Sequence, residues 1–140
     1  MSVPTNVRFP EAVDEGLARF ARQTGAPKST VVVGAVREWL RMQAHPGIVF
    51  VTDLDGERRA ALAVGPQVWT VAESWLQHDA TTRTPMAVAD TLGLTLVDVE
   101  AALAYWAEFR EEIDAVLNRH RAAQDAALAA WERRRALDGL

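Results

Sequence analysis

The stretch TNVRFP, residues 5–10, sets the strictest condition on what this chain can fold into. Polar and apolar residues alternate up to a proline, so Val7 and Phe9 would lie on one face of a β-strand. Asn6 and Arg8 would lie on the opposite face. So short a strand cannot form a sheet alone, and its partner must come from elsewhere in the chain or from a second copy of it.

The residues after this strand predict two helices. Pro10 fits the first turn of a helix, because its ring fixes φ and it has no N–H to leave unpaired. Gly25 ends the first helix after about Thr24, and Pro27 precedes a second helix that runs to about residue 44. The apolar residues at helical spacing are Val13, Leu17, Phe20, Ala21, Val32, Val36, Trp39 and Leu40.

A strand and two helices in 44 residues are too few to bury a core alone, so we predict a dimer. Two copies would pair their strands as an antiparallel ribbon and pack four helices beneath it, which removes the unpaired strand edge. The residues expected in the ribbon and dimer core are Val7, Phe9, Leu17, Val32, Val36 and Trp39. The alternative is that the strand is the solvated edge of a larger sheet.

The outer face of such a ribbon suits DNA. A two-stranded ribbon fits the major groove, where Asn6 can pair with adenine and Arg8 with guanine. The first turn of the second helix, at Lys28, Ser29 and Thr30, offers backbone N–H groups to a phosphate.

The stretches VRFPEAVDEGLARFARQTGAPKS and AVREWL resemble the ribbon-helix-helix family of DNA-binding proteins over about the first third of the chain. The resemblance implies that Asn6 and Arg8 read bases and that Lys28 and Ser29 anchor a phosphate. Pro4 stands where many members have another polar or basic residue, so the implied readout uses two side chains per copy.

The charge distribution agrees with DNA contact in the first third only. The chain has a net charge of -4, but residues 1–44 hold six basic and four acidic residues. Residues 45–140 hold nine basic and fifteen acidic residues, which predicts another kind of partner for the remainder.

HPGI at 45–48 predicts a boundary, and a hairpin follows over residues 48–64 with its turn at Asp55-Gly56. A helix is expected over residues 67–77. Its predicted inward face consists of Trp69, Ala72, Trp75 and Leu76.

Residues 86–106 have the length and the glycine turn of a helix-turn-helix. Thr84-Pro85 starts the first helix, and Thr95 with Asp98 resembles a capping box for the second. The residues predicted to point inward from this second helix are Val99, Ala102, Leu103, Trp106 and Phe109. Its first turns carry carboxylates and no basic residue before Arg110, so we predict a structural or protein-binding unit rather than a second DNA reader.

REEID at 110–114 is expected to bend or interrupt the helix before an alanine-rich helix that runs to about residue 136. The apolar stripe of this tail is Ile113, Val116, Leu117, Ala127, Leu128 and Trp131. Two interpretations stay open. The tail lies in a partner's groove, or Trp131 closes the core of its own domain and the arginines at 133–135 are a solvated helix end.

HPGIVF, the hairpin, GLT and ALAYW together resemble a small winged-helix-like domain that is frequent in prokaryotic antitoxins encoded beside PIN-like nuclease toxins. With the first resemblance, this implies a VapB-like antitoxin. The implied toxin-binding residues are Leu128, Trp131, Arg133, Arg134 and Arg135. An arginine could occupy the carboxylate cluster of such a nuclease through charge-assisted hydrogen bonds.

Catalysis has little support in the sequence. The chain has no cysteine, and His45, His78 and His120 belong to no catalytic motif. We therefore expect that the protein is not an enzyme and binds no cofactor and no metal. The alternative is a metal ion held by His45, Asp53 and Asp55. No apolar run approaches the length of a membrane helix and the N-terminus lacks a signal core, which favours a cytoplasmic protein without a membrane partner.

The expected fold is mainly α. A ribbon-helix-helix unit (1–44) is followed by a hairpin plus helix-turn-helix domain (45–110) and a C-terminal amphipathic helix (111–140). The expected function is that of an antitoxin, which binds operator DNA as a homodimer or a higher oligomer and neutralises a PIN-like ribonuclease. The alternatives are a dimeric regulator whose second domain senses a ligand or builds oligomers, and a protein-interaction scaffold without DNA binding.

Overall fold

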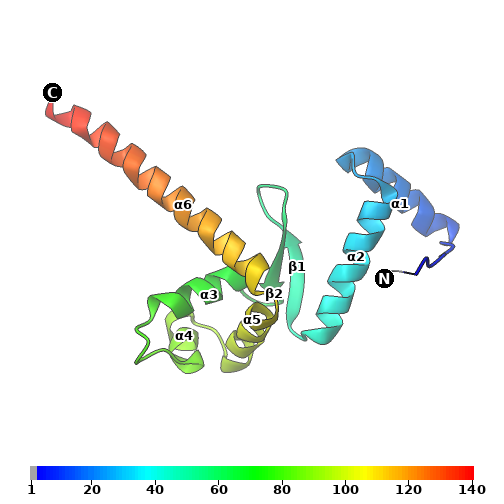
Figure 1. The fold of residues 1–140 in the computed structure, drawn as a ribbon, viewed down its shortest axis with the longest axis horizontal. Helices are drawn as coiled ribbons and strands as arrows, with labels where there is room; N and C mark the ends of the chain where they lie inside the picture. The colour runs from blue at the N-terminus through cyan, green and yellow to red at the C-terminus, as the bar shows by residue number, and fades with distance from the viewer. Residues whose placement is uncertain (1–2) are drawn as a thin grey trace. The chain divides into compact units, whose positions relative to one another are not determined.

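The computed structural model describes residues 3–140, and their fold is mainly helical, as predicted (Figure 1). Six α-helices and one two-stranded antiparallel sheet make up this part of the chain. The elements are α1 (Glu11–Thr24), α2 (Lys28–Ala44), β1 (Ile48–Thr52), β2 (Arg58–Leu62), α3 (Val68–Gln77), α4 (Pro85–Leu92), α5 (Leu96–Glu108), α6 (Arg110–Arg135) and a short 3-10 helix (Ala136–Gly139). The chain divides into two compact units, Met1–Arg41 and Met42–Leu140, called the N-terminal and C-terminal units below.

The N-terminal unit consists of an irregular segment, α1 and nearly all of α2. Pro10 caps α1 in an extended conformation, and Gly25 ends the helix with a φ of 71°, which glycine adopts without strain. Residues 3–10 have no regular secondary structure and pair with no strand within the described chain. The prediction of a strand over residues 5–9 is therefore wrong for the single chain, because no neighbouring strand supplies backbone hydrogen bonds there.

The C-terminal unit begins its fold with the predicted hairpin. β1 and β2 pair from Ile48 opposite Leu62 to Thr52 opposite Arg58. Gly56 in the turn has a φ of 82°, and its N–H donates to the carbonyl of Asp53 at 2.9 Å. The turn chemistry read from the sequence is therefore confirmed.

The predicted starts of α4 and α5 are also confirmed. The hydroxyl oxygen of Thr84 accepts from the N–H of Ala87 at 3.0 Å, and that of Thr95 accepts from Asp98 at 3.2 Å. Gly93, with a φ of 68°, turns the chain between the two helices. The prediction of an interruption at 110–114 was wrong in position. The break falls at Phe109, and residues 110–114 begin α6, which is one helix of 26 residues.

The core of the described chain lies in the C-terminal unit, where the hairpin packs with α3, α5 and the start of α6. α5 buries Val99, Ala102 and Trp106 as expected. It also buries Tyr105 completely, which the sequence pattern did not indicate. The hydroxyl of Tyr105 donates to a carboxylate oxygen of Glu112 at 2.6 Å, so the phenol is buried without losing its hydrogen bond.

The predicted inward face of α3 was partly wrong. The helix buries Val68, Val71, Ala72 and Ser74, whereas Leu76 is 41% exposed. The reason is that α3 contacts α4, α5, α6 and β2, and these neighbours cover a face rotated from the tryptophan stripe. Trp69 and Trp75 are half-buried at the edges of that face.

Candidate functional site

The N-terminal unit carries an apolar face that nothing in the unit covers. Neither α1 nor α2 has a single buried residue. Val36 and Trp39, which belong to the predicted dimer core, are 51% and 58% exposed. The other large apolar side chains exposed in this unit are Val3, Val7, Phe9, Val13, Phe20, Val33 and Leu40. So many exposed apolar side chains on two helices mark a surface that needs a partner.

Asn6 and Arg8, the candidate base-reading residues, are exposed ahead of α1. Neither side chain makes a hydrogen bond or ion pair with any residue from 3 to 140. The N–H of Asp14 donates to the carbonyl of Pro10 at 3.0 Å, so the first helical turn begins directly after the segment. Both polar side chains are therefore available to an outside ligand.

The N-terminus of α2 has the geometry of an anion site. The N–H of Val31 donates to the carbonyl of Pro27 at 3.2 Å, and this is the first bond of the helix. The N–H groups of Lys28, Ser29 and Thr30 precede it and have no helical acceptor. The ammonium of Lys28 lies 3.4 Å from a carboxylate oxygen of Asp14, which holds its charge beside these donors.

A shallow groove continues from this helix start along α2. Its volume is about 270 Å³, and Ser29, Thr30, Val33, Gly34 and Arg37 line it. A Cβ added at Gly34 would meet no atom within 4 Å, so the surface is open there. Arg37 was not among the predicted contacts, although its spacing of seven residues from Thr30 could have placed both on this face. The groove adds a guanidinium to the candidate phosphate site.

The first turns of α5 expose no basic side chain. Val97 is 75% exposed, Glu100 and Ala104 are exposed, and Asp98 is half-buried. A DNA groove would place phosphates beside these carboxylates, and like charges repel. The exposed face of α5 is therefore suited to protein contact.

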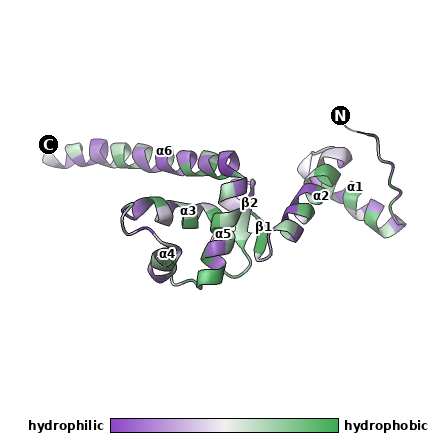
Figure 2. Ribbon diagram, turned by 60° about the horizontal axis from the view of Figure 1, so that its bottom comes forward, coloured by the Kyte–Doolittle hydropathy of each residue, from purple (hydrophilic) through white to green (hydrophobic). Residues whose placement is uncertain are grey.

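The first part of α6 belongs to the core, and the rest does not. Ile113, Val116 and Leu117 are buried, and the ring of His120 stacks on Trp69 with centroids 3.8 Å apart. No residue from 118 to 140 is buried. Figure 1 shows α6 continuing beyond α3 as a single helix, and Figure 2 shows hydrophilic residues along its length. Residues 121–135 are called the α6 arm below.

The α6 arm carries the candidate toxin-binding residues. Leu128 and Trp131 are 55% and 49% exposed, so Trp131 does not close the core of its own unit. The guanidinium of Arg135 lies 5.1 Å from the centre of the Trp131 ring, and Arg134 pairs with Asp138 at 3.6 Å. Together with Arg133, these residues give the arm apolar and cationic side chains that are open to a partner.

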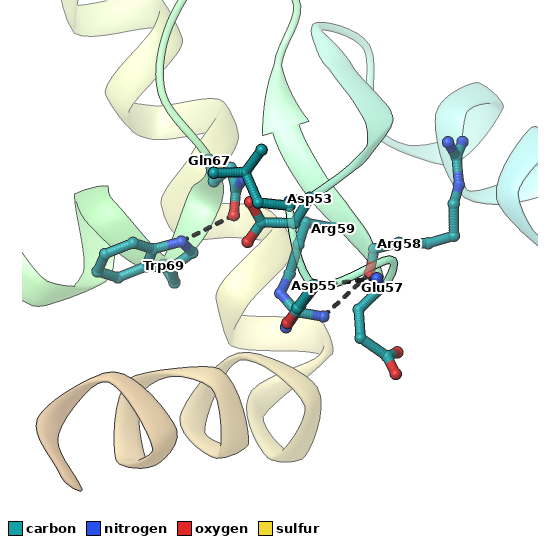
Figure 3. A network of polar contacts seen from close by, with 8 residues as sticks. Asp53, Asp55, Glu57, Arg58, Arg59, Gln67 and Trp69 are labelled. Carbon is teal, nitrogen blue, oxygen red and sulfur yellow. Dashed lines mark hydrogen bonds and ion pairs between the residues drawn. The ribbon is translucent and has the colours of Figure 1, made fainter. Parts of the chain in front are cut away.

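A second pocket lies in the C-terminal unit around a buried arginine that the sequence did not single out. Arg59 on β2 is 8% exposed, and its Nη2 donates to a carboxylate oxygen of Asp55 at 2.9 Å (Figure 3). Its Nε has no hydrogen-bond partner among the described residues. The period of two along RRAAL could have placed Arg59 on the inner face of the hairpin, opposite to Arg58.

The histidines serve local packing. His45 contacts Glu108 through its Nε2 and packs against the rings of Tyr105 and Phe109. Since Asp55 binds Arg59 instead, the structure does not bring His45, Asp53 and Asp55 together as a metal site. Within residues 3–140, no three histidine or carboxylate side chains gather in a way that could hold a metal ion.

The candidate residues thus belong to two different units of the chain. Residues 3–10 and the start of α2 carry the predicted DNA contacts, while the α6 arm carries the predicted toxin contacts. Comparison with protein-family models, curated proteins and solved structures found no match for this chain. Among the described helices, none combines the length and apolar character needed to cross a membrane.

Proposed function

We propose that this protein is a homodimeric antitoxin that represses its own promoter and neutralises a PIN-like ribonuclease. Two copies pair residues 5–9 as an antiparallel ribbon, which enters the major groove of operator DNA. The α6 arm of each copy binds the toxin. The observation that carries the proposal is the absence of any buried residue in α1 and α2.

Dimerisation follows from the energetics of the N-terminal unit. α1 and α2 are 14 and 17 residues long, and isolated helices of that length are marginal in water. Each large apolar side chain that becomes buried contributes about 1.5–3 kcal/mol. A second copy offers the same apolar face, so a symmetric four-helix arrangement would cover Phe9, Leu17, Val36 and Trp39 at once.

DNA binding is supported by what remains exposed in such a dimer. Asn6 and Arg8 have no partner within the described chain, and both suit bidentate contacts with bases. The N–H groups at the start of α2, with Lys28 and Arg37 nearby, would hold a phosphate on each side. The ribbon would supply specificity and the helix starts would supply orientation.

Toxin binding is supported by the charge and exposure of the chain end. Residues 118–140 carry five arginines and three acidic side chains, whereas residues 42–117 carry four basic and twelve acidic side chains. A cationic arm with Leu128 and Trp131 exposed suits an acidic partner with an apolar groove. A nuclease that holds metal ions with clustered carboxylates has that character.

Removing the α6 arm tests the toxin half of the proposal. A chain that ends at Arg121 keeps Ile113, Leu117 and the His120 stack on Trp69, so the C-terminal unit should stay folded. We expect unchanged affinity for the operator and a loss of nuclease inhibition by at least about a hundredfold, as expected when apolar and arginine anchors are removed from an interface. The assay measures RNA cleavage by the product of the adjacent gene.

Two point variants of the full chain refine this test. Trp131→Ala should weaken inhibition by at least about tenfold, because buried tryptophans are frequent anchors of interfaces. Ala130→Ser changes the neighbouring position without removing an anchor and should inhibit like the natural protein. Full inhibition by the chain that ends at Arg121 would show that the arm is not the neutralising element.

A second candidate function is a dimeric regulator whose C-terminal unit senses a small ligand. The pocket at Arg59 favours it, because an antitoxin needs no such pocket to bind a toxin. Copurification with the product of the adjacent gene separates the two functions. A stable complex with a nuclease supports the antitoxin, and the absence of any complex supports the sensor.

A further inference from the structure

The Arg59 pocket is the space between β2, α3 and α6 in the C-terminal unit. It measures about 240 Å³, and its side chains include Arg59, Trp69, Ile113, Val116 and Arg119. Because every one of these residues belongs to the C-terminal unit, the pocket is independent of the proposed DNA contacts. It is equally independent of the α6 arm, which begins after these residues.

Arg59 is the chemical centre of the pocket. A guanidinium has five N–H donors. The described residues supply Asp55 at 2.9 Å and the carbonyl of Arg58 at 3.4 Å, while the buried Nε has no acceptor. A buried cationic group with an unused donor is costly unless another acceptor reaches it. Figure 3 shows the Arg59 guanidinium beside Asp55, with the carboxylate of Glu57 pointing away.

The rest of the pocket is lined by two more arginines and an apolar wall. The guanidinium of Arg58 donates to the hydroxyl of Thr52 and to the carbonyl of Phe50, which leaves Arg119 as the second cation considered for a ligand. Arg119 on α6 is exposed and makes no hydrogen bond or ion pair within residues 3–140. Ile113 and Val116 are buried behind it. The indole of Trp69 is held in place by the His120 stack and by its N–H, which donates to Gln67 at 2.8 Å. Two guanidiniums therefore border a rigid apolar surface.

These features define the ligand by charge and size. An oxyanion would meet Arg59 and Arg119, but Asp55, Glu57 and Glu112 lie in or beside the pocket and would repel a second negative charge. One carboxylate fits this balance better than a phosphate. A dry cavity of about 150 Å³ is large enough to bind benzene, so 240 Å³ holds one aromatic ring and its carboxylate.

We propose that the Arg59 pocket binds a small aromatic monocarboxylate, with the carboxylate between Arg59 and Arg119 and the ring against Trp69, Ile113 and Val116. A carboxylate would accept charge-assisted hydrogen bonds from arginine N–H groups, and the ring would cover the apolar wall of the pocket. Ligand binding would tie β2, α3 and α6 together. The C-terminal unit should therefore gain stability when the ligand is present.

Benzoate is the probe for this site and is titrated into the full-length protein. Binding is followed by the NMR signal of the Trp69 indole N–H, which is assigned as the signal that disappears in Trp69→Phe. We expect a saturable shift of that signal and a rise in the melting temperature. Benzyl alcohol has the same ring without the charge. Inorganic phosphate and phenyl phosphate carry a phosphate group in place of the carboxylate. All three should bind at least about tenfold more weakly, given the strength of hydrogen bonds to charged groups.

Variants on α6 complete the experiment without disturbing buried Arg59. Arg119→Ala should weaken benzoate at least about tenfold, while Arg121→Ala removes an arginine outside the pocket and should change nothing. Ala115 also lines the pocket, so Ala115→Trp should fill it and abolish binding. Equal affinity for benzoate and benzyl alcohol, or equal affinity of the two arginine variants, would overturn the proposal. Tighter binding of phenyl phosphate than benzoate would overturn the carboxylate assignment.

Discussion

Arg8→Ala is expected to remove most of the sequence-specific affinity for operator DNA while leaving the dimer intact. A good bidentate contact between arginine and guanine contributes about 1–3 kcal/mol of discrimination, and a symmetric dimer has two of them. The loss should therefore be about 2–6 kcal/mol, or roughly 30-fold to 10⁴-fold in Kd. The measurement is a salt-controlled titration of the protein's own promoter fragment against a scrambled fragment of equal length.

Arg22→Ala is the matched control, since it removes the same charge from the exposed surface of α1. Each variant removes one positive charge, but only Arg8 is proposed to contact bases, so only Arg8→Ala should bring the two fragments to equal affinity. If Arg8→Ala kept its preference for the promoter, the side chain would not read bases.

Val36→Asp is expected to unfold the N-terminal unit and to give a monomer. Val36 is 51% exposed in the single chain, and the proposed dimer buries it between helices. Burying an unpaired carboxylate costs several kcal/mol, and each dimer would bury two. Without the partner, α1 and α2 should lose their helical signal by circular dichroism, because neither helix has a core of its own.

The thermal unfolding of the C-terminal unit shows whether Val36→Asp unfolds only the N-terminal unit. Its buried core contains no residue of α1 or α2, so its thermal transition should persist in Val36→Asp. Val97→Asp places the same substitution on α5 at a position that is 75% exposed, and it should leave mass and helicity unchanged. A dimeric Val36→Asp with full helicity would contradict the proposed dimer interface.

Elements with local causes could be predicted from the sequence. The hairpin followed from Asp55-Gly56, and the starts of α4 and α5 followed from the hydroxyls of Thr84 and Thr95. In each case a short run of residues sets the turn or supplies the cap. Gly93 likewise ends α4 because glycine adopts a positive φ easily.

Features that depend on distant neighbours could not be predicted. The burial of Tyr105 depends on Glu112 as its hydrogen-bond acceptor, and the inner face of α3 depends on which helices cover it. The burial of Arg59 could not be predicted from RRAAL, because it depends on the elements that pack around β2. The proposed pairing of residues 5–9 would need a second chain, so it is not visible in a single copy.

The two units therefore differ in how their stability arises. The C-terminal unit buries a continuous core within one chain, while the N-terminal unit leaves its apolar side chains exposed. In the proposed function this difference makes DNA binding depend on dimerisation, because base reading would require two copies. At low concentration the first unit should separate and unfold before the second, because dimer stability depends on concentration.

Titration of the full-length protein with its own promoter, with the mass of the free and bound protein measured by light scattering, tests the central claim most directly. Our account predicts a free protein of twice 15.4 kDa that binds the promoter at least about 10³-fold more tightly than scrambled DNA. A monomer of 15.4 kDa, or equal affinity for both DNA fragments at physiological salt, would contradict it.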